Sequence, residues 1–198
     1  MKQLRVSNSP LLDPQFCAVV LISPEALDQT FIDPSTHATC ERAIEVLLRA
    51  AEVAEVPVFI LAHEPEQDSP SSGALPSTPS ELRFGLEPHR SPWAHRPFAE
   101  ALAAQDRTIL ILAGVWLEHE ILAAALNALV DGYDVYVLLD GSAPRSALAS
   151  VTARERLTQA GGTPITTSQV ISEWSFETTD ASLRAELIVL LRELLDIK

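Results

Sequence analysis

Residues 108–140 read TILILAGVWLEHEILAAALNALVDGYDVYVLLD, and this stretch decides the fold class. An apolar run of strand length over 108–115 leads through a short turn into an alanine- and leucine-rich helix over 118–130. A second apolar strand follows over 134–139. The pattern predicts a strand–helix–strand unit with parallel strands. Ligands bind at the carboxyl ends of strands in open α/β sheets, so the turn at 113–116 marks a candidate site.

The same alternation continues on both sides of this stretch. Apolar runs over 16–22 and 56–61 are typical of strands buried on both faces. Asp33-Pro34 is a start signal for a helix between them. We expect further helices from Pro97, from Ser146 to Ala160, from Ser168 and over 180–198, and a short strand over 163–167. The sequence therefore predicts a three-layer α-β-α fold over residues 1–198, with a parallel sheet of about five or six strands.

Residues 64–92 interrupt the alternation. The segment is rich in proline and serine, as in SPSSG and PSTPS, and it holds few apolar residues before Leu82 and Phe84. We expect a long surface loop here. Such loops are lids or binding loops in some proteins and disordered in others, and the composition favours neither outcome.

Composition and charge exclude several classes of partner. The chain has 198 residues, of which 47% are hydrophobic and 21% charged, as in soluble globular proteins. Its net charge of −13 disfavours binding to nucleic acid or to an anionic membrane. No apolar run is long enough to cross a bilayer, and the first ten residues lack the apolar region of a signal peptide. With only two cysteines, no disulfide framework is expected, and we expect a cytoplasmic protein.

Several blocks of sequence resemble the isochorismatase-like (cysteine hydrolase) family. Ile22-Ser23-Pro24-Glu25 is similar to the family's Leu-Ile-Asp-x-Gln opening, and residues 112–120, LAGVWLEHE, are similar to its Ala-Gly-Val-Trp-Thr-Glu-x-Cys turn. Residues 159–173 are similar to its closing strand and helix, and Trp93 stands where members often carry an aromatic residue. The resemblance implies the family fold, with a cis non-proline peptide at Val115-Trp116 or Trp116-Leu117.

The resemblance also implies a chemistry for which this chain lacks the usual residues. In the family, a cysteine thiolate attacks a small amide, an aspartate acts as base, and a lysine orients the pair. The corresponding positions are Glu120 for the cysteine, Ser23 for the aspartate, and Leu86 or Glu87 for the lysine. A subset of the family cleaves a vinyl ether without a cysteine, but it too keeps the acidic residue that Ser23 replaces here.

Other side chains of the required types offer poor substitutes. Arg83 or Arg90 would have to swing in to supply the missing cation. Cys17 begins the first strand and Cys40 lies in the first helix, so we expect both to be core or surface thiols. A metal site is not expected because His63 stands without the family's Asp-x-His pattern, and no cofactor is expected.

If the family geometry holds, one pocket contains Ser23, Glu120 and the backbone of Trp116-Leu117-Glu118. Trp93 and Val115 complete the candidate binding residues for a small-molecule ligand. Glu120 has two interpretations: a carboxylate that stabilises the start of a helix electrostatically, or a general base or an anchor for a cationic ligand. Ser23 as a nucleophile would depend on Glu120 as its base.

Two functions follow from these residues. In the first, the chain has lost cysteine-hydrolase activity and acts as a small-molecule-binding or interaction protein. In the second, it hydrolyses a small amide or related substrate through Glu120 and Ser23. The sequence favours a nucleotide-binding protein less, because no glycine-rich phosphate turn follows the first strand. The leucine-rich segment 180–197 is expected to pack on its own sheet or on a neighbour, and we expect a homo-oligomer, a dimer or larger.

Overall fold

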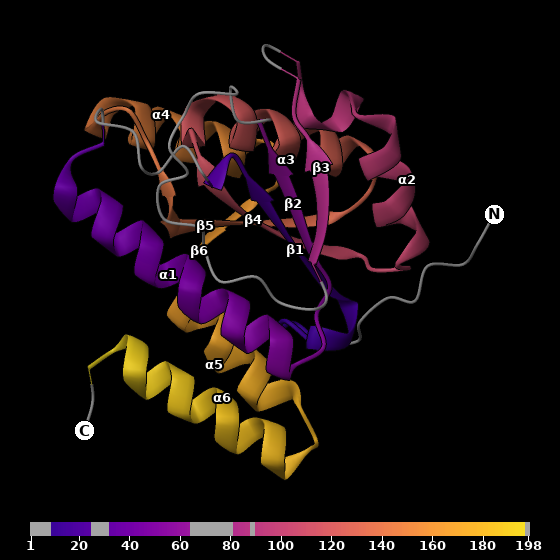
Figure 1. The fold of residues 1–198 in the computed structure, drawn as a ribbon, viewed down its shortest axis with the longest axis vertical. Helices are drawn as coiled ribbons and strands as arrows, with labels where there is room; N and C mark the ends of the chain where they lie inside the picture. The colour runs from indigo at the N-terminus through magenta and orange to yellow at the C-terminus, as the bar shows by residue number, and fades with distance from the viewer. Residues whose placement is uncertain (1–8, 25–31, 64–80, 88–89, 197–198) are drawn as a thin grey trace.

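A six-stranded parallel sheet forms the centre of the molecule, in the order β3-β2-β1-β4-β5-β6 (Figure 1). The computed structural model describes residues 9–24, 32–63, 81–87 and 90–196. The strands are β1 (Cys17–Ile22), β2 (Val58–Ala62), β3 (Glu81–Gly85), β4 (Ile109–Val115), β5 (Asp134–Ala143) and β6 (Thr163–Ile165).

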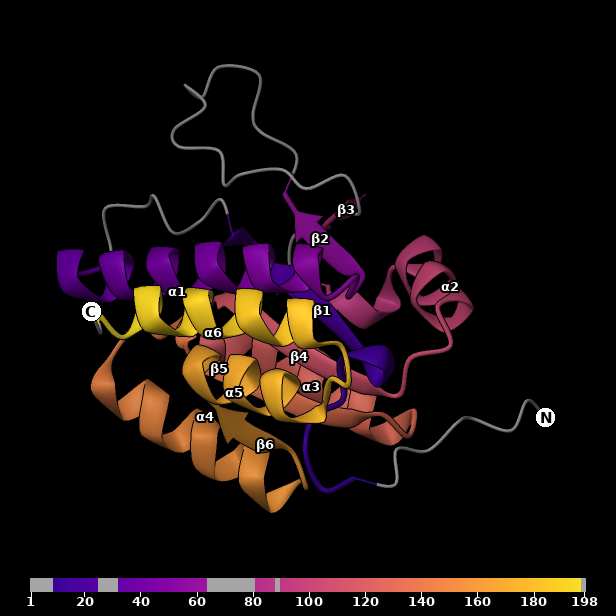
Figure 2. The same cartoon turned by 90° about the horizontal axis from the view of Figure 1, so that it is seen from below.

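Helices cover both faces of this sheet, so the expected three-layer α-β-α fold is confirmed (Figures 1 and 2). One face carries α1, α5 and α6, and the other carries α2, α3 and α4. Their bounds are α1 (Pro34–Val53), α2 (Arg96–Ala104), α3 (Leu122–Val130), α4 (Ala147–Gln159), α5 (Thr167–Glu177) and α6 (Ala181–Leu194). Short helical turns occur at η1 (Pro14–Phe16), η3 (Pro92–Ala94) and η4 (Leu117–Ile121).

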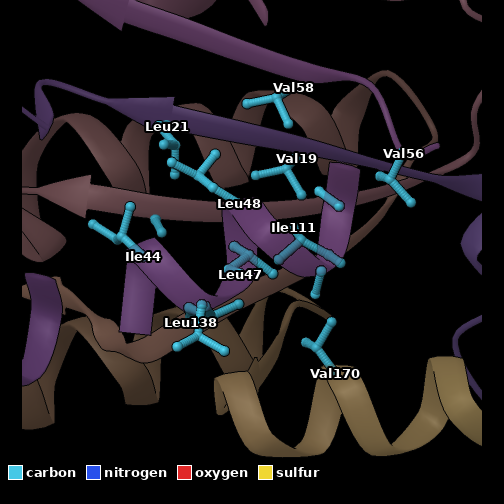
Figure 3. Packing of buried hydrophobic residues seen from close by; sticks show 14 of the residues in the cluster. Val19, Leu21, Ile44, Leu47, Leu48, Val56, Val58, Ile111, Leu138 and Val170 are labelled. Carbon is cyan, nitrogen blue, oxygen red and sulfur yellow. The ribbon is translucent and has the colours of Figure 1, made fainter. Parts of the chain in front are cut away.

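The apolar runs of the sequence become strands buried on both faces. All six residues of β1 and all seven of β4 are buried, as a parallel sheet between two helical layers requires. Val19 and Leu21 of β1 pack toward Leu47 and Leu48 of α1 in one core (Figure 3). The intervening residues of the strand join a second core under α2, α3 and α4.

The helix start signals at Asp33 and Ser146 act as predicted. The carboxylate of Asp33 accepts hydrogen bonds from the backbone N–H groups of Ser35 and Thr36, at 3.0 and 3.1 Å. Ser146 Oγ accepts from the N–H of Ala149 at 3.1 Å. Each cap satisfies amides that lack a partner within the helix, which fixes where α1 and α4 begin.

Three sequence expectations need correction. The segment 64–92 is not one continuous loop, because 81–85 form the edge strand β3, paired in parallel with β2; residues 64–80 and 88–89 lie outside the described part of the chain. β5 runs on to Ala143 instead of ending near 139, past a register shift opposite Leu112 and Gly114. α5 begins at Thr167 because Thr166 and Gln169 form a capping box.

The last helix does not pack on the sheet. α6 lies outside α1 and α5 and contacts both (Figure 2). Leu187 and Leu190 are buried in that contact, whereas the side chain of Val189 is 61% exposed. An ion pair of 2.6 Å between Arg49 and Glu193 joins α1 to α6. The helix thus packs on two helices of its own chain, and the expectation that it packs on the sheet is wrong.

Candidate functional site at the carboxyl edge of the sheet

The site is built on a crossing of strands that admits only glycine. Gly114 of β4 pairs with Ile22 of β1 on one side and with Ser142 of β5 on the other. Its φ is +130°, and a Cβ at this position would lie 1.9 Å from the carbonyl oxygen of Ile22. The absence of a side chain lets β1 and β4 meet closely at their carboxyl ends.

The turn after Gly114 has the geometry that the family resemblance implied. The Val115-Trp116 peptide is cis, as expected. The chain then forms η4, a π-helical turn, where a regular helix from Glu118 was expected. The N–H of Ile121 donates to the carbonyl of Trp116 at 3.4 Å, which spans five residues. Such wide turns commonly occur at functional sites because they re-aim side chains.

Glu120, at the family's cysteine position, turns back toward this peptide. Its Oε2 lies 3.4 Å from the N–H of Trp116, a long and weak hydrogen bond. The carboxylate therefore stands beside an amide that opens the helical segment, where a negative charge is stabilised. This contact corresponds to the electrostatic interpretation of Glu120, and the side chain also lines a surface cavity.

Ser23 is closed off from that cavity. Its side chain is 3% exposed, its φ is 48°, and its N–H donates to the carbonyl of Leu61 at 2.7 Å. The Oγ atom has no hydrogen-bond partner among the described residues, and no bond joins it to Glu120. Pro24 is also buried, while Glu25 lies outside the described part of the chain.

Glu118 is a partly buried carboxylate on η4. Its side chain is 15% exposed, and Oε1 accepts from the N–H of Arg145 at 3.2 Å. Oε2 is buried without a hydrogen-bond partner among the described residues. A buried acceptor without a donor is costly, so the Glu118 carboxylate is not fully satisfied by the described residues.

A cation that sequence reasoning missed also reaches this turn. The guanidinium of Arg145, on the loop after β5, lies 4.7 Å from the centre of the Trp116 ring. The family's lysine position offers nothing comparable, since Leu86 is buried and Glu87 pairs with Arg90 at 2.6 Å. Arg83 is engaged with Glu81 at 3.0 Å. No sequence signal indicated Arg145, because it comes to Trp116 only through the pairing of β4 with β5.

Trp93 packs within the fold beside the candidate site. Its Nε1 donates to Asp131 Oδ2 at 2.6 Å, and its ring meets those of Phe98 and Tyr133 edge-on, with centroids 5.6 and 6.1 Å apart. Neighbouring Ser91 accepts a hydrogen bond from Asn127 of α3 at 3.3 Å. Trp93 thus anchors the segment before α2 to the far end of α3.

The cavity beside Glu120 has a volume of about 470 Å³. It lies along α3, between the segment before α2 and α4, and Glu118 and Glu120 are among its walls. Ser23, Trp93, Val115, Trp116 and Leu117 do not line it, so the structure brings together only part of the expected pocket. The lining residues are Arg90, Ser91, Pro92, Glu118, His119, Glu120, Leu122, Ala123, Leu126, Asn127 and Arg156.

Neither cysteine of the chain lies at this site. Cys17 pairs with Ile109, at the opposite end of β4 from Val115, about 20 Å away at the usual rise of a strand. Cys40 lies in α1, on the other face of the sheet. Burial raises the pKa of each thiol to about 12. Both side chains are free of disulfides and buried, as expected for core thiols.

A half-buried carboxylate, that of Asp140, occupies the irregular part of β5. Asp140 accepts hydrogen bonds from the N–H of Thr167 at 3.0 Å to each carboxylate oxygen, and from its Oγ1 at 3.1 Å. Burial raises the pKa of Asp140 above its ordinary value, and the bonds from Thr167 oppose that rise. The contact ties the start of α5 to the carboxyl end of the sheet.

The described residues contain neither a candidate membrane span nor a candidate metal site. No helix there combines the length and the apolar character needed to cross a membrane. No group of three or more histidine, cysteine, aspartate or glutamate side chains in that part of the chain is arranged to hold a metal ion. Nδ1 of His63 lies 3.0 Å from the carbonyl oxygen of Leu86.

The fold and the turn define the class of protein first: an α/β protein whose candidate site lies at the carboxyl edge of a parallel sheet. The sequence then matches the model of the isochorismatase domain over residues 30–169. Because this match covers more than half of the chain, the protein belongs to the isochorismatase family.

Two curated relatives share parts of the sequence. The chain is 34% identical over 87 residues to a probable hydrolase, YcaC, of Escherichia coli (strain K12). These residues make up 44% of this chain and 40% of the relative. It is 28% identical over 123 residues to isochorismatase domain-containing protein 2 of Xenopus laevis. That aligned region makes up 62% of this chain and 58% of the relative. The matches thus span about half the length of these relatives.

Solved structures resemble the fold over nearly its full length. The E. coli YcaC crystal structure, described as an octameric hydrolase of unknown specificity, has a TM-score of 0.76 at 22% identity and covers 96% of this chain and 97% of that one. YcaC from Pseudomonas aeruginosa, with hexane-2,5-diol and covalent acrylamide, has a TM-score of 0.75 at 20% identity and covers 97% of each chain. At these identities the likeness shows the fold alone.

Proposed function

We propose that this member of the isochorismatase family binds a small molecule in the cavity beside Glu120 and has lost the cysteine-hydrolase reaction. One observation carries the proposal. The two cysteines of the chain are buried away from the site with a pKa of about 12 each, and a carboxylate stands at the family's thiol position. A thiol with such a pKa is almost wholly protonated at neutral pH, and it is the thiolate that attacks a carbonyl carbon.

The alternative is a hydrolase that uses Glu120 and Ser23. Glu120 lines a cavity, which favours a role as a base that directs water. The arrangement of Ser23 favours the alternative less, because its Oγ is buried and makes no hydrogen bond with Glu120. A serine nucleophile needs a base within hydrogen-bond reach.

Turnover assays distinguish the two functions. Purified protein and the Glu120→Gln variant are incubated with nicotinamide and a panel of small amides, and release of ammonia is measured. We expect no release above the uncatalysed background from either protein. Release by the wild-type chain that disappears in Glu120→Gln would establish the alternative. A circular dichroism spectrum of the variant serves as the folding control.

We also propose that the protein forms a homo-oligomer in the cytoplasm. The octameric state of the E. coli YcaC structure supports assembly, as do the exposed apolar side chains of Leu148 on α4 and Val189 on α6. Two unpaired cysteines are compatible with a reducing compartment. Light scattering of the wild type and of the Val189→Lys and Leu148→Lys variants tests the assembly. A monomeric mass for the wild type would contradict it.

A further inference from the structure

The cavity beside η4 carries charges of both signs, contributed by different elements. Glu118 and Glu120 line it from η4, whereas Arg156 lines it from α4 and Arg90 from the segment before α2. Between them the floor is apolar, formed by Leu122, Ala123 and Leu126 of α3. A cavity with separated charges and an apolar floor is suited to a ligand with the same pattern of groups.

The guanidinium of Arg156 is available at the cationic end of the cavity. Arg156 is exposed in the last turn of α4, and no ion pair joins it to a carboxylate in the described part of the chain. Arg90 is paired with Glu87, but both side chains are about 60% exposed, and an exposed pair of this kind contributes little and exchanges partners readily. An anionic group is therefore the natural ligand for this end.

The acidic end needs a donor. Oε2 of Glu118 is a buried acceptor without a partner among the described residues, and its Oε1 is held by the N–H of Arg145, close to the start of α4. Arg156 lies nine residues after Ala147, the first residue of that helix, and so about 13 Å further along it. The two charged ends are thus separated along the cavity, and the carboxylates of Glu118 and Glu120 would attract an ammonium group of a ligand to the acidic end.

We propose that this cavity binds a zwitterionic small molecule, with a carboxylate or similar anionic group at Arg156 and Arg90, an apolar body over α3, and an ammonium group at Glu118 and Glu120. This names the ligand class for the proposed function and rests on it. The protein has a net charge of −13, which repels an anionic group at long range. Binding of such a group would therefore depend on the arginines that line this cavity.

Three probes of one shape test the proposal by isothermal titration at constant ionic strength. They are 4-(aminomethyl)benzoate, which carries both charges, 4-methylbenzoate, which carries only the negative one, and benzylamine, which carries only the positive one. We expect the zwitterion to bind about tenfold more tightly than either single-charged probe. Equal affinities, or no binding of the zwitterion at millimolar concentration, would overturn the proposal.

Variants assign the ends. Arg156→Gln should weaken the zwitterion about tenfold and leave benzylamine unchanged, while Glu118→Gln should weaken the zwitterion and benzylamine. Arg154→Gln is the matched control, because Arg154 is exposed on the same helix but lines a different cavity. An equal loss in Arg154→Gln and Arg156→Gln would overturn the assignment. These affinities are independent of ammonia release, so failure here is distinguishable from failure of the proposed loss of hydrolysis.

Discussion

The guanidinium of Arg145 lies over the indole ring of Trp116, 4.7 Å from its centre. The same residue donates its backbone N–H to Glu118. The loop between β5 and α4 therefore holds the turn after β4 by two contacts, one to each end of the Trp116-Leu117-Glu118 segment. The cis Val115-Trp116 peptide lies directly before this segment.

The stacking of Arg145 on Trp116 should be measurable. Arg145→Gln is expected to lower the free energy of unfolding by about 0.5–1 kcal/mol, the contribution of a cation–π pair at an exposed site. Urea denaturation followed by circular dichroism provides the measurement. Arg154→Gln removes the same charge from the outer surface of α4 and should change the free energy by less. Equal effects of the two substitutions would show that net charge, and not the stacking, is responsible.

Gly114 should tolerate no side chain. Gly114→Ala places a Cβ 1.9 Å from the Ile22 carbonyl oxygen at a φ of +130°, so we expect a loss of about 3 kcal/mol or more in unfolding free energy, or failure to fold. Gly85→Ala is the control, because no atom lies within 4 Å of its added Cβ and an exposed substitution usually changes stability by about 0.5 kcal/mol or less. Similar stability of the two variants in urea would contradict the close approach of β1 and β4.

Asp140 should make stability depend on pH. Because burial raises its pKa above the ordinary 3.8, the folded state favours the protonated acid. Its stabilising contribution is complete below that ordinary value and is lost as the pH rises through the raised pKa. In Asp140→Asn this loss is absent, so the stability of the variant relative to wild type should increase with pH.

Thr167→Val provides the companion test for Asp140. The hydroxyl and N–H of Thr167 stabilise the ionised carboxylate, so removing the hydroxyl should raise the pKa further and deepen the loss of stability at high pH. Urea unfolding of wild type and both variants between about pH 4 and about pH 8 gives the comparison. A constant difference in unfolding free energy between wild type and Asp140→Asn across this range would count against a raised pKa of Asp140.

The thiols should be unreactive in the folded protein. Cys17 and Cys40 are 0% and 2% exposed, and with a pKa of about 12 each they should resist Ellman's reagent under native conditions. Both should react after unfolding in guanidinium chloride. Glu120→Cys, which introduces a thiol into the cavity wall, is the positive control and should add one rapidly labelled group. Rapid labelling of the wild-type chain would contradict the absence of an accessible thiol and weaken the proposed function.

Local signals in the sequence predicted the elements whose ends are fixed by nearby residues. Asp33 and Ser146 accept the first amides of their own helices, so their effect does not depend on distant parts of the chain. The ends of other elements depend on pairing with strands that are distant in sequence, and local signals do not predict those ends. β3 forms because β2 presents an edge to residues 81–85, and β5 extends to Ala143 because it pairs with Val115.

The sequence by itself determined the parallel sheet between helical layers, because continuous apolar runs must be buried on both faces and helices must cover them. It also determined that Glu120 stands at the family's thiol position and Glu118 two residues before it, because the turn after Val115 is recognised from neighbouring residues alone. Only the tertiary structure decided which side chains share the site. Arg145, Arg156 and Asn127 come to it from separate elements, and Ser23 is closed off from it, because strand pairing and helix packing set those distances and no spacing along the chain does.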